Sequence, residues 1–266
     1  MTAVIAHRGA RSLAPENTLV AARIACELGA DLWETDVSMT KEGHLILFHD
    51  PTLDRCTDVA SVFPGRSSTR VIDYTLNEIL RLDAGSHFVR TDPFGGIKDG
   101  AVTPEMIAEF KNEKIPTLEQ GLDLVTETDW QVNLELKCHD SDSADFTVPD
   151  RTVETIRKSG IRPGRIRISS FNHDWLLRVQ KKEPTLRVQA LVGYDGHTPL
   201  DFGDLSFDTY NANADLITDD QIRMLQSRGK SVNLFTVNDP KRFYHFARLG
   251  VDGIFTDFPQ TFVTHG

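Results

Sequence analysis

Segments with the pattern of buried β-strands alternate along this chain with segments of helical periodicity, and this alternation constrains the fold most. Eight segments are short, apolar and rich in β-branched residues: Val4–Arg8, Leu32–Val37, Val132–Lys137, Arg165–Ser170, Leu186–Val192, Asn211–Ile217, Ser231–Val237 and Val251–Asp257. The segments between them with apolar residues at helical spacing are Asn17–Leu28, Leu118–Thr126, Arg151–Lys158, Asp174–Lys182, Asp219–Arg228 and Pro240–Leu249. Strands that alternate with helices predict a parallel sheet.

Eight such strands in a chain of 266 residues predict a closed (β/α)₈ barrel, a fold that typically needs about 250 residues. An open, doubly wound sheet is the alternative, but the G-x-G-x-x-G pattern is missing after the first strand. Gly160, Gly229 and Gly250 stand just past three of the predicted helices, where a left-handed cap favours glycine. We therefore expect one barrel domain over residues 1–266.

The alternation is broken after the second strand. Lys41-Glu42-Gly43 has the composition of a turn, and a strand-like run that ends in His49 follows it. This pattern predicts a hairpin that folds His49 back towards Asp36. Residues 51–116 then form an insertion, with one helical stretch at Leu76–Leu82 and a loop rich in Gly, Asp and Pro at Thr91–Thr103.

Composition limits the partners and the compartment. There are 29 Lys and Arg against 39 Asp and Glu, a net charge of −10, which argues against binding to nucleic acid or to anionic membranes. The three cysteines form no C-x-x-C pair, which argues against a disulfide framework. No signal-peptide pattern and no apolar run of about 18 residues is present, so we expect a cytoplasmic protein without stable membrane insertion. No oligomeric state follows from the sequence.

Two predicted strands carry acidic residues at alternate positions near their ends. Glu34 and Asp36 share one face of the second strand, and Glu135 and Lys137 share one face of the next barrel strand. Two carboxylates buried side by side are costly unless a cation neutralises them, and oxygen-only ligands suit Mg²⁺, Ca²⁺ or Mn²⁺. The alternatives are an outward-facing acidic pair and a structural ion pair between Glu135 and Lys137.

Two histidines complete a possible phosphate-cleaving site. His7 and Arg8 end the first strand, and the carboxyl ends of barrel strands commonly carry catalytic groups. His7 and His49 both titrate near neutrality and would serve as general acid and general base on either side of a phosphorus atom. Arg8, Lys137 and a metal ion would then neutralise the phosphoryl oxygens. A capping histidine beside a surface arginine is the alternative for His7 and Arg8.

At this point the sequence resembles the glycerophosphodiester phosphodiesterase family over residues 4 to about 260. The resemblance is carried by an ordered set of motifs: His7-Arg8-Gly9, Pro15-Glu16-Asn17-Thr18, Glu34-Thr35-Asp36-Val37, His49-Asp50, Thr52-Leu53-Asp54-Arg55, Leu82-Asp83-Ala84-Gly85-Ser86, Ile115-Pro116-Thr117-Leu118-Glu119, Leu134-Glu135-Leu136-Lys137, Ser169-Ser170-Phe171 and Gly250 to Pro259.

The resemblance implies a (β/α)₈ barrel that hydrolyses glycerophosphodiesters to sn-glycerol 3-phosphate and an alcohol, as part of lipid and glycerol metabolism. It implies one divalent cation, Mg²⁺ or Ca²⁺ with Mn²⁺ as an alternative, on Glu34, Asp36 and Glu135. His7 and His49 match the acid–base pair, and Arg8 and Lys137 match positions that contact phosphate. Glu119 matches a position near the site. The expected partner is a small-molecule glycerophosphodiester.

One departure bears on substrate choice. The family usually has Trp before Thr-Val-Asn, where this chain has Phe235. That position commonly lines the substrate pocket, so Phe235 is a candidate substrate contact, and the preferred alcohol is left open. Two other activities stay open as well. An exposed apolar rim beside the mouth of the barrel would favour a lysophospholipase D-like phosphodiesterase. A non-catalytic phosphate-binding barrel would not need paired histidines.

Overall fold

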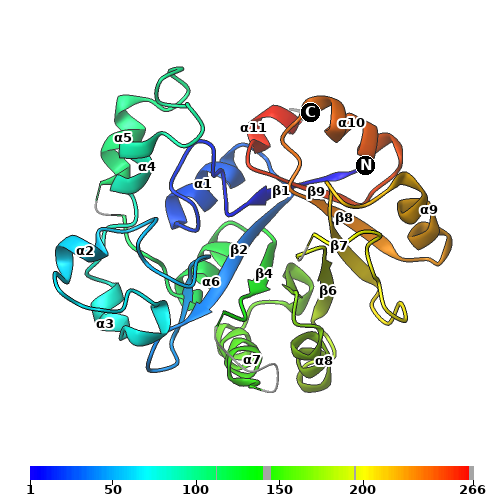
Figure 1. The fold of residues 1–266 in the computed structure, drawn as a ribbon, viewed down its shortest axis with the longest axis horizontal. Coiled ribbons are helices and arrows are strands. Elements are labelled where there is room, and N and C mark those ends of the chain that lie inside the picture. Colours follow the sequence, from blue (N-terminus) through cyan, green and yellow to red (C-terminus); the bar gives the residue numbers. More distant parts are fainter. Residues whose placement is uncertain (112, 140–144, 195, 264–266) are drawn as a thin grey trace.

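The computed structural model describes residues 1–111, 113–139, 145–194 and 196–263, and a ring of parallel strands lies at its centre (Figure 1). Each strand pairs with the next around the ring, and the last pairs with the first. In order, the barrel strands are β1 (Ala3–His7), β2 (Leu32–Met39), β4 (Val132–Leu136), β5 (Ile166–Ser170), β6 (Arg187–Val192), β7 (Thr209–Asn213), β8 (Ser231–Phe235) and β9 (Gly253–Thr256). The predicted (β/α)₈ barrel is therefore confirmed.

The predicted hairpin is also confirmed. Strand β3 (Leu45–Leu47) runs antiparallel to the end of β2, with Val37 opposite Leu47. The backbone N–H of Phe48 donates to the carbonyl of Asp36 at 2.9 Å. Residue 49 thus arrives beside the carboxyl end of β2 from a hairpin rather than from a barrel strand.

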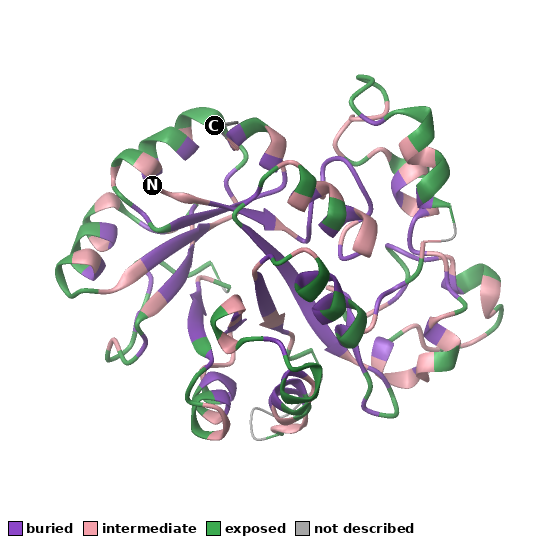
Figure 2. Cartoon of the chain, turned by 180° about the vertical axis from the view of Figure 1, so that it is seen from behind, coloured by how far each residue is buried: buried purple, intermediate pink, exposed green. Residues whose placement is uncertain are grey.

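Helices cover the outside of the barrel, and their buried faces point inwards (Figure 2). Threonine caps start several of them: the Thr18 side chain accepts from the N–H of Ala21, and Thr117 forms a capping box with Gln120. The covering helices are α1 (Leu19–Glu27), α6 (Leu118–Glu127), α7 (Thr147–Ser159), α8 (His173–Lys182), α9 (Asp219–Ser227), α10 (Pro240–Arg248) and α11 (Pro259–Phe262), together with the 3₁₀ turn η2 (Pro163–Arg165). The predicted cap glycines 160, 229 and 250 all have positive φ.

No helix in the described part of the chain has the length and apolarity needed to cross a membrane.

Part of the barrel interior is polar below the ends of the strands, beside an apolar cluster of Ile5, Leu32 and Phe255. Side chains alternate between the helix-facing and the interior face, and the interior ones hydrogen-bond from strand to strand. Asn133 donates to Ser169 at 2.8 Å, Asn211 donates to Gln189 at 3.1 Å, and Asn233 donates to Asn211 at 2.9 Å. These bonds give partners to amide groups that are buried inside the barrel, although Asn133 Oδ1 has none among the described residues.

Residues 51–116 lie beside the barrel and contain more helix than the sequence predicted (Figure 1). The structure has α2 (Val59–Val62), the 3₁₀ turn η1 (Val71–Asp73), α3 (Leu76–Ile79), α4 (Ser86–Thr91) and α5 (Pro104–Phe110). Only residues 76–82 were predicted to be helical, because helices of four to seven residues are too short to show a clear helical periodicity of apolar residues. The assignment of one domain with an insertion stays a prediction.

Part of this segment has a hydrophobic cluster of its own. Ile46 and Phe48 from the hairpin pack there with Leu53, Tyr74 and Ile79, all of them buried. The hairpin therefore has two attachments: hydrogen bonds to β2, and apolar contacts with residues 51–116.

The turn after β1 is crowded and left-handed. Gly9 has φ of +86°, and a Cβ at this position would lie 2.7 Å from the backbone carbon of Ala21. Gly29 has nearly the same φ, +87°, but a Cβ there would meet nothing within 4 Å. We predict that Gly9→Ala lowers the free energy of unfolding by roughly 3 kcal/mol, from backbone strain plus overpacking.

Gly29→Ala is the matched control, because it carries the backbone strain without the clash. It should cost about 1–2 kcal/mol. Urea denaturation of both variants checks the pair, and equal losses would contradict the close approach of the Gly9 turn to Ala21.

Candidate active site

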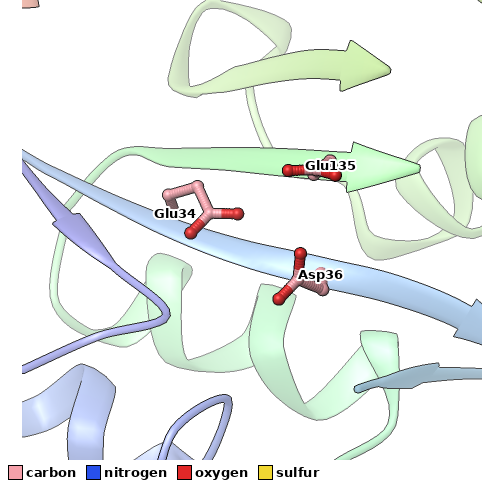
Figure 3. Close-up of side chains that lie close together, drawn as sticks. All are labelled: Glu34, Asp36 and Glu135. Carbon is pink, nitrogen blue, oxygen red and sulfur yellow. The ribbon is translucent and has the colours of Figure 1, made fainter. Parts of the chain in front are cut away.

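Three carboxylates from neighbouring strands meet at the carboxyl end of the barrel. Glu34 and Asp36 project from β2, and Glu135 projects from β4 beside them (Figure 3). One oxygen of each lies within 4.8 Å of an oxygen of the others. Glu34 and Asp36 are 1% exposed, so the cluster is shielded from water. The predicted alternation along both strands is what brings these groups together.

Two cationic side chains neutralise part of this charge. The Lys137 ammonium lies 2.9 Å from Asp36 Oδ1 and also contacts Glu135 Oε1. Arg8 Nε lies 3.2 Å from Asp36 Oδ2, and the Arg8 backbone N–H donates to Glu34 Oε2 at 2.9 Å. Burial opposes ionisation of Asp36, but the charges of Lys137 and Arg8 outweigh it and hold its pKa well below the usual value.

Glu34 is in the opposite situation. Burial, followed by the charges of Asp36 and Glu135, raises its pKa well above the usual value. Its Oε1 is buried and has no hydrogen-bond partner among the described residues. The cluster therefore has a carboxylate oxygen for which the described part of the protein supplies no donor.

Asn17 fixes the position of Asp36, and the sequence analysis did not single it out. Its Nδ2 donates to Asp36 Oδ2 at 2.8 Å, and its Oδ1 accepts from the Asp36 backbone N–H and the Thr35 hydroxyl. Asn17 itself has φ of +57°, a left-handed conformation that asparagine tolerates better than most residues. The sequence does place an asparagine directly before the capping Thr18. The hydrogen-bond partners of that asparagine, however, depend on the fold.

Each predicted catalytic histidine is hydrogen-bonded to a carboxylate. His7 Nδ1 lies 2.7 Å from Asp257 Oδ1, and His49 Nδ1 lies 2.7 Å from Asp50 Oδ1. With Nδ1 donating to the carboxylate, Nε2 is the ring atom left to accept or donate a proton. The His7 and His49 side chains are 15% and 31% exposed. Burial lowers the pKa of His7, with Asp257 opposing part of that shift.

Glu16 connects the two histidine–aspartate pairs through arginines. Its carboxylate accepts from Arg11 at 3.0 Å, from Arg8 at 2.8 Å and from Arg55 at 2.6 Å. Arg11 also contacts Asp257, and Arg55 also donates to Asp50. Although burial opposes it, these guanidinium contacts hold the pKa of Glu16 well below its usual value. A continuous chain of ion pairs thus runs between the partners of His7 and His49.

Phe235 and Glu119 are the remaining residues predicted to lie at or near the site. Phe235, the last residue of β8, packs edge-on against Phe171 at 5.9 Å between ring centroids. Phe171 in turn contacts Tyr194, which is 83% exposed. Glu119 lies on the first turn of α6 and is exposed. Its predicted closeness to the site stays a prediction.

A small cavity adjoins the cluster beside Lys137. It has a volume of about 170 Å³, and His139, Ser38 and Asp145 supply polar groups to its wall. The structure places His139 at the edge of the candidate site.

This geometry can be compared with known proteins. A model of the glycerophosphoryl diester phosphodiesterase family matches residues 7–261. The chain belongs to this family. Membership places it among the phosphoric diester hydrolases, and the expected resemblance is confirmed.

Individual relatives cover nearly the whole chain. A glycerophosphodiester phosphodiesterase of Caldanaerobacter subterraneus subsp. tengcongensis is 34% identical, with 98% of this chain and 96% of the relative aligned. One from Bacillus altitudinis is 33% identical over the same shares. A solved Oleispira antarctica phosphodiesterase, in complex with the product sn-glycerol-3-phosphate, is 25% identical with a TM-score of 0.80 and covers 98% and 95% of the two chains.

The ion-pair chain through Glu16 predicts a pH-dependent stability. Because the pKa of Glu16 is depressed in the folded state, its contribution is present above its unfolded pKa of about 4.3 and is lost as the pH falls below that value. We predict that Glu16→Gln lowers the free energy of unfolding by roughly 3 kcal/mol at pH 7. The difference from wild type should stay constant down to about pH 5 and shrink at lower pH.

Urea denaturation at several pH values measures this difference. Glu127→Gln is the control, because the Glu127 side chain is 63% exposed and pairs with Arg23 only at 3.8 Å. It should change stability by less than about 1 kcal/mol. A Glu16 variant that behaves like the Glu127 variant would rule out a stabilising role for the ion-pair chain.

Proposed function

We propose that this protein hydrolyses glycerophosphodiesters to sn-glycerol 3-phosphate and an alcohol. The observation that carries the proposal is the pair of histidine–aspartate units beside three clustered carboxylates, in a chain of this family. The Oleispira antarctica neighbour, whose complex contains sn-glycerol-3-phosphate, supports this choice of product. A phosphate-binding barrel without catalysis would have no use for two oriented histidines.

A divalent cation fits the three carboxylates. Glu34, Asp36 and Glu135 offer only oxygen ligands, the type that Mg²⁺ and Ca²⁺ prefer, and Glu34 Oε1 has no other partner among the described residues. A bound ion would polarise a phosphoryl oxygen and stabilise the charge that develops on it. Lys137 and Arg8, which now contact the same carboxylates, would then be available to the phosphate group.

The two histidines divide the proton transfers. Burial lowers the pKa of His7, so the imidazole ring is neutral near pH 7. Its Nε2 can therefore take the proton of the hydroxyl that attacks phosphorus. The attacking oxygen bonds to phosphorus as the bond from phosphorus to the leaving alcohol oxygen breaks. His49, held by Asp50, donates a proton to that leaving oxygen. Asp257 accepts from Nδ1 of His7, which leaves Nε2 free to take a proton, and Asp50 accepts from Nδ1 of His49, which leaves the proton on Nε2 to be donated.

The aromatic side chains at the mouth of the barrel bear on the choice of alcohol. Phe235 and Phe171 form one wall, and Tyr194 extends that wall into solvent. An exposed apolar rim is the feature that favours a lysophospholipase D-like activity, so Tyr194 keeps this second candidate open. A wall of three aromatic rings offers apolar contact, but it is small compared with an acyl chain. We therefore favour a glycerophosphodiester over a lysophospholipid as the substrate.

The histidine roles predict specific losses. His7→Ala and His49→Ala should each reduce the turnover of glycerophosphocholine by roughly 10²- to 10⁴-fold, the range for general acid–base groups. Lysophosphatidylcholine is assayed beside it, and a higher kcat/KM for that lipid would move the second candidate to first place.

His245→Ala is the matched control, because His245 lies on α10 with an Asp219 partner and is exposed. It should keep wild-type rates, and circular dichroism should show all three variants folded. Wild-type turnover in both His7→Ala and His49→Ala would refute the proposed mechanism.

The cation site predicts a pH-dependent affinity. Without metal the raised pKa of Glu34 keeps its carboxyl protonated above the usual range, and a cation must displace that proton to bind. The affinity for Mg²⁺ or Ca²⁺ should therefore increase with pH through a range above the usual pKa of a glutamate, with a proton released on binding. Calorimetric titration of chelator-treated protein in buffers of different ionisation enthalpy measures both quantities.

Glu34→Gln should weaken binding and abolish the proton release. An affinity that is independent of pH, with no proton released, would contradict the assignment of Glu34 as a ligand. This binding measurement is separate from turnover, so it tests the metal site even if the substrate assignment fails.

A further inference from the structure

The opposite end of the barrel contains a second polar cavity. Its volume is about 400 Å³, and residues at the amino ends of the strands surround it. Arg187 is the first residue of β6, and Arg167 is the second residue of β5. The acidic cluster lies on β2 and β4 and gathers at their carboxyl ends, so the two sites open at opposite ends of the barrel.

Two arginines face this cavity from neighbouring strands. Arg167 and Arg187 are paired in the register of β5 and β6, so their side chains project from the same face. That face is the interior one, because Ile166, Ile168 and Val188 at the alternate positions are buried in the core against the helices. The two guanidinium groups therefore enter the same space.

These arginines have no carboxylate partner in the described part of the chain. There, neither lies within 4.0 Å of a carboxylate oxygen, and the hydrogen bond of Arg167 is to Gln131 Oε1 at 2.8 Å. Burial and the charge of Arg187 together lower the pKa of Arg167. Other arginines near this end are paired, as Arg165 is with Asp129. Two adjacent cations without an anion repel each other, and the repulsion is stronger here because Arg167 is half-buried, although Arg187 is exposed.

The acidic groups of the same cavity are already engaged elsewhere. Asp31 accepts from the backbone N–H of Val4 at 2.8 Å, and Asp252 accepts from the backbone N–H of Val232 at 2.8 Å. They precede β2 and β9, whereas the arginines lie on β5 and β6, and at least one strand separates each aspartate from the arginines. The cavity thus has a positive side on which donors converge, with the amide of Gln189 beside the arginines.

We propose that the amino-terminal mouth of the barrel binds a small phosphate dianion between Arg167 and Arg187. Planar guanidinium groups match the oxygens of phosphate and can donate two hydrogen bonds each. The volume admits inorganic phosphate or a small phosphate monoester. This site is separate from the proposed catalytic centre and does not depend on its activity.

Phosphate binding to the whole, metal-free protein tests the site. Wild type, Arg167→Gln/Arg187→Gln and the control Arg162→Gln/Arg223→Gln are titrated with inorganic phosphate, with glycerol 3-phosphate and with chloride at constant ionic strength. The control removes the same charge from residues whose side chains are 76% and 58% exposed and do not line the cavity. Calorimetry gives the number of sites, and the unfolding midpoint gives the ligand-induced stabilisation.

We expect wild type and the control to bind one more phosphate ion than the Arg167/Arg187 variant binds. If the variant still binds this additional phosphate, its affinity should be at least tenfold lower. Any phosphate bound at the catalytic centre is common to all three proteins and cancels. Without phosphate the variant should be no less stable than wild type, because the arginines pair with no carboxylate among the described residues. If the double variant does not fold, Arg187→Gln alone, at an exposed position, gives the same comparison.

Binding of glycerol 3-phosphate but not inorganic phosphate would assign the site to monoesters, and the reverse result would assign it to the free ion. Equal phosphate binding by wild type and the Arg167/Arg187 variant would overturn the proposal. An equal loss in the control would also overturn it, because the effect would then come from net charge.

Discussion

The balance of charge around Asp36 is the constraint on which the rest of the site depends. A carboxylate that is 1% exposed needs compensating groups, and here Arg8, Lys137 and Asn17 supply them from three different segments. To reach this position Arg8 adopts a left-handed backbone with φ of +56°, and the following turn needs a glycine. The ends of β1, β2 and β4 are therefore fixed to one another by electrostatics as well as by the sheet.

The charges of the whole site can be summed in the same way. Six carboxyl groups and four cationic side chains form one connected group, which carries an excess of two negative charges when Glu34 has lost its proton and both histidines are neutral. The carboxyl groups belong to Glu16, Glu34, Asp36, Asp50, Glu135 and Asp257, and the cations to Arg8, Arg11, Arg55 and Lys137. A single divalent cation on the proposed ligands would bring the sum to zero. The acidity of the chain is thus compatible with binding an anionic substrate.

Local periodicity explains what could be predicted from the sequence. A two-residue period places Glu34 and Asp36 on one face, and the Lys-Glu-Gly turn sets the hairpin that brings His49 to them. Local periodicity does not predict the partners of the histidines. His7 and Asp257 are 250 residues apart in the chain, and only barrel closure between β1 and β9 brings them together. Lys137 also shows the limit: its pairing with Glu135 was one of the alternatives, but its contact with Asp36 follows from the pairing of β2 with β4.

The two attachments of the hairpin imply that the proposed acid–base pair spans two parts of the molecule that can open separately. His7 belongs to a barrel strand bonded on both sides, whereas His49 follows Phe48, whose ring is packed in the small cluster formed with residues 51–116. Local opening of that cluster would withdraw one histidine while the barrel stayed closed, because cooperative units of a protein open with different free energies. The rate of amide hydrogen exchange around Phe48 then becomes a measure of how often the site is complete.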